Sequence, residues 1–260
     1  METPTNFGWF HLMFIGIAIL LTVLLCIKFK DCDDKTFRRI ALIGWILILI
    51  LEIYKQLSFS FSVDGSYGAW DYQWYAFPFQ FCSSPLYVLP FIIFTNEGKV
   101  RDAFISYMST FSLFAGLAVF VYPNDVFIST IGINIQTMIH HGLQIVFGIY
   151  FAVYARRKLS IRNYAKSIPV FMGFSLIAIL LDVIVYKVFV LKEITETFNM
   201  FFISPYFPCT LPILSVIYEK VHYSVFLCMY LIGFTLVSAL VYFIEKAIFI
   251  AFSKTKRYVK

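Results

Sequence analysis

The sequence predicts an all-α integral membrane protein, a single domain of seven transmembrane helices with its N-terminus outside and its C-terminus in the cytoplasm. Hydrophobic residues make up 60% of the 260 residues and charged residues only 14%, which is too little charge to cover a water-soluble surface. Seven apolar runs are long enough to span about 30 Å of hydrocarbon. The runs cover residues 10–27, 40–58, 77–95, 102–121, 131–154, 167–190 and 223–252.

Several runs have features of their own. No basic residue precedes the first run, and Lys28 and Lys30 follow it, so we expect a retained anchor rather than a cleaved signal peptide. Pro78, Pro85 and Pro90 predict a kinked or partly unwound third helix. The seventh run exceeds the bilayer thickness and should continue as a cytoplasmic helix. Residues 194–216 are also apolar, but three prolines interrupt them, so we expect a re-entrant or interfacial segment instead of an eighth span.

The basic residues fix the orientation. Alternate loops place 17 Lys and Arg residues on one side of the predicted membrane and 4 on the other. Positive residues favour the cytoplasmic side, and inserting or removing one helix would destroy this alternation. The formal charge of +6 is therefore a topology signal, and we expect no nucleic-acid partner.

Polar residues within the apolar runs point to a functional site, because such residues are costly in hydrocarbon. They fall on four helices, in the half of each predicted to lie toward the outside. They include Glu52, Lys55, Gln80, Cys82, Asn134, Gln136, Thr137, His140, His141, Gln144 and Asp182. The polar positions of the fifth helix occupy one face at 100° per residue. The sequence therefore predicts a polar cavity in the outer half of the bundle.

Each of these residues also has a structural interpretation. Glu52 and Lys55 can neutralise one another, and a lone intramembrane histidine commonly bonds between helices. Cys82 can form a disulfide with Cys209, which is predicted on the same side. We expect no metal site, because adjacent histidines in a helix point about 100° apart.

A cysteine–histidine pair is the sharper hypothesis. A thiol becomes a nucleophile when an adjacent base takes its proton. Cys82 and His141 are predicted at comparable depth, on helices that can be neighbours. Asn134 and Gln144 share the polar face and can orient the imidazole or donate to an oxyanion.

Three short motifs carry a family resemblance: residues 77–85 (FPFQFCSSP), 137–142 (TMIHHG) and 199–202 (NMFF), the last followed by Pro205. Together they resemble the YwaF family of bacterial integral membrane proteins, which is similar to the eukaryotic transmembrane protein 164 family of acyltransferases that remodel ether phospholipids. The resemblance implies a seven-helix fold and a cysteine–histidine acyl-transfer site. Cys82 would be the nucleophile, His141 (or alternatively His140) the base, and Asn199 a positioning residue. Relatives often have a histidine where this chain has Gln80.

The leading hypothesis is therefore a phospholipid acyltransferase or transacylase that uses membrane lipids, a phospholipid donor and a lysophospholipid acceptor, and no cofactor. Substrate-binding or orienting roles are expected for Gln80, Asn134, Gln136, Gln144, Asn199, Glu52, Lys55 and Asp182. One alternative is a carrier or channel for a small polar solute that uses the same cavity. Another is a non-catalytic sensor or assembly partner. The Phe, Ile, Lys and Tyr content is compatible with an AT-rich bacterial genome, so we expect a bacterial cytoplasmic membrane.

Overall fold

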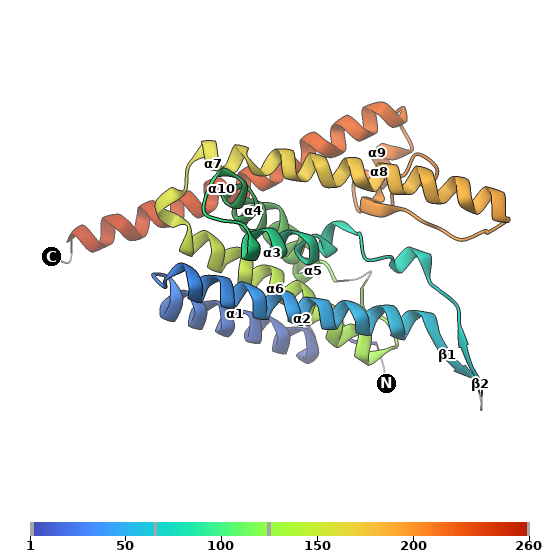
Figure 1. Cartoon of the computed structure of the whole chain (residues 1–260), viewed down its shortest axis with the longest axis horizontal. Helices are drawn as coiled ribbons and strands as arrows, with labels where there is room; N and C mark the ends of the chain where they lie inside the picture. Colours follow the sequence, from blue (N-terminus) through green and yellow to red (C-terminus); the bar gives the residue numbers. More distant parts are fainter. Residues whose placement is uncertain (1–2, 65–66, 124–125, 259–260) are drawn as a thin grey trace.

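The computed structural model of the chain describes residues 3–64, 67–123 and 126–258. The long helices lie roughly along one common axis, and the connections between them gather at the two ends of the bundle (Figure 1). We call the end with the β-hairpin at Phe61–Trp70 the hairpin end. The opposite end, which holds the loops at residues 30–33, 95–98 and 155–166 and the last turns of the C-terminal helix, is called the basic end.

Five helical stretches in the described part of the chain are long and apolar enough to cross a membrane. These are Trp9–Phe29, Asp34–Ser60, Lys99–Val121, Ile161–Lys192 and Tyr223–Ala251. They match five of the predicted runs. A sixth long helix, α6 (Ile131–Tyr154), follows the predicted bounds of the fifth run, but its polar residues make it less apolar. The protein is therefore an integral membrane protein with a helical architecture.

The second helix begins earlier than its apolar run suggests. Helix α1 (Trp9–Phe29) is followed by a short loop, and α2 starts at Asp34 and continues to Ser60. The Asp33 side chain caps α2 by accepting a hydrogen bond from the Thr36 amide at 3.2 Å. Arg38 pairs with Asp34 one turn earlier at 2.7 Å. Charges that resemble a loop in the sequence thus form the first turns of the helix.

The third predicted helix begins later than expected. Residues 77–80 are not helical, and the 3-10 turns η1 (Trp74–Ala76) and η2 (Phe81–Ser83) flank them before α3 (Pro85–Phe94) begins. Proline has no amide hydrogen to donate and restricts the residue before it, so the prolines of this region oppose a regular helix there. The helix predicted over 77–95 therefore begins only at Pro85, and the partial unwinding predicted from its prolines is confirmed.

The fourth span contains a turn of π-helix. Helix α4 (Lys99–Tyr107) runs through η3 (Met108–Ser112) into α5 (Leu113–Val121), so the span begins three residues before the predicted start. Every side chain of η3 is buried. Such π turns are rare and occur where local contacts override regular hydrogen bonding. No sequence pattern predicted this one.

The hairpin end carries a small two-stranded sheet that the sequence did not predict. Strand β1 (Phe61–Asp64) pairs antiparallel with β2 (Tyr67–Trp70), with Phe61 opposite Trp70. The pairing satisfies the backbone of a segment that leaves α2. It leads into the irregular stretch before α3.

The chain after α6 contains η4 (Arg156–Lys158), α7 (Ile161–Ala165), α8 (Ser167–Lys192), η5 (Met200–Phe202), α9 (Leu214–Tyr218) and α10 (Tyr223–Tyr258). Residues 193–213, here called the return segment, fold back from the end of α8 toward the middle of the bundle (Figure 1). Phe198, Met200, Phe201 and Ile203 are buried. The return segment therefore packs against protein and is not an additional long helix. Lys260 lies outside the described residues, as do the side chains of Lys254, Lys256 and Arg257.

Helix α6 lies at the centre of the bundle, packed against α1, α2, η3 and α5, and most of its side chains are buried. Glycine permits the closest of these approaches. A Cβ atom placed on Gly116 of α5 would lie 2.8 Å from the carbonyl oxygen of His141 and 2.9 Å from Cβ of Gln144. One of these atoms is backbone and the other is a Cβ atom, so neither can move aside easily. Helices α5 and α6 therefore pack too closely at Gly116 to admit a larger residue.

We expect Gly116→Ala to lower the stability of the protein by about 1–3 kcal/mol, because the added methyl group must push α5 away from α6. Gly173→Ala is the matched control, since no atom lies within 4 Å of a Cβ placed on this α8 residue. Its effect should be neutral or stabilising by up to about 1 kcal/mol through helix propensity. Thermal unfolding of the detergent-solubilised protein measures both, and equal melting temperatures for the two variants would contradict the packing argument.

Candidate functional site

Cys82 lies in the short 3-10 turn η2, where the irregular residues 77–80 join α3. The residue is partly exposed, while Ser83 and Ser84, which follow it, are buried. In an apolar environment, backbone outside regular helix needs hydrogen-bond partners from elsewhere in the protein. The partners of Cys82 come from α6.

Two side chains of α6 contact the backbone carbonyl of Cys82. His140 Nε2 lies 2.9 Å from this oxygen, and the Gln144 side-chain amide donates to it as well. Both α6 residues are buried, and their spacing of four residues places them on one helix face. The structure therefore brings Cys82 and His140 into direct contact, through the cysteine backbone.

His141 is held by its own helix. Its Nδ1 lies 2.8 Å from the carbonyl oxygen of Thr137, one turn earlier, and its ring centroid is 5.2 Å from that of His140. A carbonyl oxygen can only accept, so Nδ1 of His141 and Nε2 of His140 carry the protons of the neutral rings. The remaining nitrogens, Nε2 of His141 and Nδ1 of His140, have no hydrogen-bond partner in the described part of the chain. Each imidazole thus presents one free basic nitrogen.

An ion pair on α2 joins the buried Glu52 to the partly exposed Lys55. Lys55 Nζ is 2.9 Å from a carboxylate oxygen of Glu52, and Gln56 donates to Glu52 at 2.7 Å and to the carbonyl of Ala76 at 2.6 Å. The pair interacts electrostatically with Cys82 and with His140. The predicted neutralisation of Glu52 by Lys55 is therefore present, and the charges of the pair act on the cysteine.

Gln80 connects the cysteine turn to the return segment. Its side-chain amide donates to the carbonyl of Asn199 at 3.0 Å, and its side-chain oxygen accepts from the amide of Phe201 at 3.0 Å. Gln80 thus joins two irregular segments of backbone.

Asn199 and Asp182 stabilise the return segment further. Asn199 accepts from the Ser204 amide and donates to the Pro208 carbonyl, each at 3.0 Å. Asp182 of α8 is fully buried and accepts from the Met200 amide at 2.7 Å. Both side chains therefore act on the backbone of the return segment.

The other predicted residues lie farther from the cysteine turn or have different partners. Both polar groups of the Asn134 side chain bond the backbone of Ile128, so Asn134 fixes the loop before α6 rather than an imidazole. Gln136 is buried and contacts Thr137 at 3.4 Å. Cys82 and Cys209 are both free thiols in this structure, without the disulfide considered from the sequence.

Two contributions to the site could not be predicted from residue types. The Thr137 carbonyl orients His141, and the Ala76 carbonyl fixes Gln56 beside Glu52. Both are backbone carbonyl groups, which every residue has, so the amino-acid types do not reveal which of them contribute. Within the described residues, no cluster of three or more His, Cys, Asp or Glu side chains is arranged to hold a metal ion.

The comparison with protein families gives one match. The model of the TMEM164 family matches residues 6–244, which include every residue of the cysteine turn, the histidine pair and the return segment. No curated protein and no solved structure matches the chain.

We expect Gln80→Ala to release the return segment locally. Loss of the Gln80 acceptor should make the Phe201 amide exchange with deuterium about five- to tenfold faster, because one intramolecular hydrogen bond contributes about 1 kcal/mol. Hydrogen–deuterium exchange of peptides covering residues 199–204 measures this. Gln73→Ala is the control, since that side chain bonds only Asp71 at the hairpin end among the described residues. Unchanged exchange in Gln80→Ala would show that other contacts hold the segment.

Proposed function

We propose, from the premise that this chain belongs to the TMEM164 family, that it is a membrane-embedded phospholipid acyltransferase with Cys82 as its nucleophile. The observation that supports the proposal is the contact between Cys82 and α6. A partly exposed thiol lies on a turn held by His140 and Gln144, next to a second histidine with a free basic nitrogen. A thiol and a neutral imidazole are the two groups that acyl transfer through a thioester requires.

The proposed reaction exchanges one ester for another. The basic nitrogen of His141 takes the Cys82 proton, and the thiolate attacks the sn-2 ester carbonyl of a phospholipid. The tetrahedral intermediate collapses, the C–O bond breaks, and the departing lysophospholipid oxygen takes the proton from the imidazolium. A second lysophospholipid hydroxyl then attacks the thioester, its proton passes to His141, and the released thiolate is reprotonated. His140 is the alternative base.

Lipid substrates suit the surroundings of Cys82. The bundle is embedded in lipid, so both the donor ester and the acceptor hydroxyl are available without a soluble carrier. The half of α6 nearer the hairpin end carries His140 and His141, roughly 14–15 Å along the helix from Ile131. If the hairpin end faces outward, this location favours a lipid donor over cytoplasmic acyl-CoA. Transfer between two esters needs no cofactor.

We infer seven crossings and the predicted orientation for the same protein. Helix α6 and the shorter apolar stretch Phe81–Phe94 would complete the five apolar spans. The loops at residues 30–33, 95–98 and 155–166 meet at the basic end, where Arg156 and Lys158 lie beside the loop residues Asp31 and Glu97. This grouping supports a cytoplasmic basic end, in a bacterial cytoplasmic membrane.

Cys82→Ala should abolish acyl transfer, with at least about a thousandfold loss of rate, because the variant lacks the thiol on which the proposed thioester forms. The assay follows exchange of a labelled acyl chain between phospholipid and lysophospholipid in vesicles. Intact-protein mass spectrometry of the wild type should also show an acyl adduct on Cys82 that hydroxylamine removes. Cys209→Ala, which alters a buried thiol of the return segment, is the matched control and should remain active. Full activity in Cys82→Ala would refute the proposal.

The two histidines should differ in their effects. We expect His141→Ala to lower the transfer rate by about 10²–10⁴-fold and to prevent the acyl adduct, as loss of a general base does. His140→Ala removes a contact to the Cys82 carbonyl and should affect thermal stability as well as rate. If His140→Ala prevents the adduct and His141→Ala does not, His140 is the base and the assignment of His141 is wrong.

A further inference from the structure

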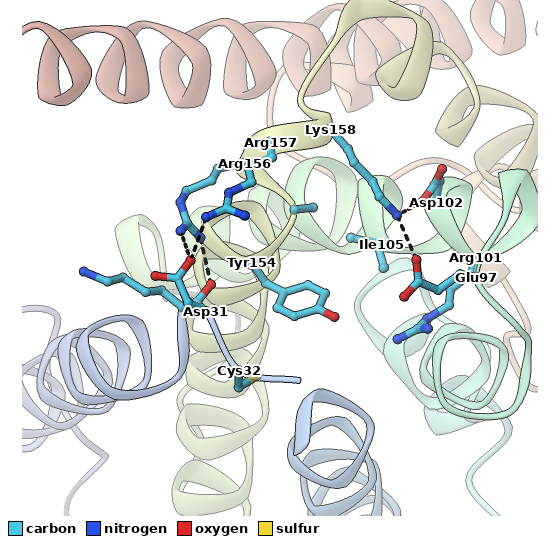
Figure 2. Close-up of a pocket in the computed structure, with 12 residues that line it drawn as sticks. Asp31, Cys32, Glu97, Arg101, Asp102, Ile105, Tyr154, Arg156, Arg157 and Lys158 are labelled. Atoms are coloured by element: carbon cyan, nitrogen blue, oxygen red, sulfur yellow. Dashed lines mark hydrogen bonds and ion pairs between the residues drawn. The ribbon is translucent and has the colours of Figure 1, made fainter. Parts of the chain in front are cut away.

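A second polar site lies at the basic end, away from Cys82. A cavity of about 410 Å³ opens there between the loop after α1, the loop before α4 and the end of α6 (Figure 2). Its charged lining residues are Lys30, Asp31, Glu97, Arg101, Asp102, Arg156, Arg157 and Lys158. The volume is in the range of small-ligand sites.

Ion pairs shape this cavity and leave it with excess positive charge. Arg156 and Arg157 both pair with Asp31, and Lys158 lies 3.3 Å from Glu97 and 3.7 Å from Asp102. The side-chain hydrogen bond from Arg156 lowers the pKa of Asp31, so this carboxylate stays ionised at neutral pH. Five basic side chains still face three acidic ones.

Arg101 is the decisive residue. Its side chain is only 2% exposed, it pairs with Asp34 through Nη2, and its guanidinium carbon lies 5.3 Å from the ring centroid of Phe37. Its Nε and Nη1 groups have no hydrogen-bond acceptor among the described residues. A buried guanidinium with unpaired N–H groups is costly, and an acceptor in the adjoining cavity would remove that cost.

We propose that this cavity binds a phosphate group, held by Arg101 together with Arg157 and Lys30. A guanidinium donates charge-assisted hydrogen bonds to phosphate oxygens, and such bonds would satisfy the N–H groups of Arg101 that have no acceptor among the described residues. Basic pockets between helices on the cytoplasmic side of a membrane take phospholipid headgroups, and the same chemistry would take free phosphate from water. The site goes beyond the proposed acyl transfer and does not depend on it.

The experiment measures thermal unfolding of the full-length protein in detergent at constant ionic strength. The probes are inorganic phosphate and short-chain dihexanoyl phosphatidic acid, with dihexanoylglycerol as the same lipid without its phosphate. A ligand that binds the folded state raises the melting temperature with concentration. A rise with phosphatidic acid alone identifies a headgroup site, and a rise with both phosphate probes identifies a site for phosphate from either source.

Variants assign the effect to the cavity. Arg101→Gln should weaken the apparent affinity at least about tenfold, since a charge-assisted bond to a buried group is lost. Arg101 is buried, so a Lys30→Gln, Arg157→Gln double variant at exposed side chains provides a second test, with about threefold weaker binding expected. Arg39→Gln is the control: Arg39 is exposed at the same end but does not line the cavity.

Two results overturn the proposal. One is the absence of any melting-temperature shift with either phosphate probe. The other is a melting-temperature shift of the same size in Arg101→Gln, in the double variant and in the Arg39→Gln control. The phosphate would then bind elsewhere. Acyl transfer in the Cys82 assay is a separate readout, so failure of the phosphate site and failure of the proposed reaction are distinguishable.

Discussion

The need of the Cys82 carbonyl oxygen for hydrogen-bond donors is the constraint that determines how the helices around it pack. This oxygen belongs to backbone outside a regular α-helix, in a region where water cannot satisfy it, so it needs donors from another helix. His140 and Gln144 supply them. A helix that carries such donors is too polar to face lipid, which explains why α6 is central and why α5 packs closely against it. The chemistry of the site and the position of α6 therefore have the same cause.

The return segment obeys the same constraint. Its backbone groups lack the partners that a regular helix would supply, and Asp182, Asn199 and Gln80 bond them instead. Gln80 matters most here, because it also belongs to the irregular stretch that leads to Cys82. The two irregular segments are thus bonded to each other, and a glutamine supplies one donor and one acceptor at once. Neutral histidine also has one of each, but its fixed ring geometry places them differently.

How much of this was predictable depends on the kind of signal. Apolar runs predicted the long helices, and the polar face of residues 131–154 predicted which helix buries the most polar side chains, because both signals are local and periodic. The late start of α3 and the π turn at Met108–Ser112 depend on tertiary contacts that no periodicity records. The basic cavity was missed for another reason. In the sequence, Arg101 and Arg156 look like any other basic residues that mark the cytoplasmic side of a membrane protein. They line one cavity only because the fold brings distant parts of the chain together.

Depth in the bundle separates two kinds of chemistry. At the basic end, water can solvate full charges, so Arg, Lys, Asp and Glu form open ion pairs. Near Cys82 the only nearby charges are Glu52 and Lys55 among the described residues, and these neutralise one another at 2.9 Å. A reaction that starts from a neutral thiol and a neutral imidazole creates its ion pair only when the proton moves. The Lys55 ammonium would then stabilise the new thiolate, while Glu52 would stabilise an imidazolium on His140, the alternative base. The α2 ion pair would thus act as a fixed dipole that favours proton transfer from Cys82 to His140 rather than to His141, so the charges of α2 bear on which histidine serves as the base.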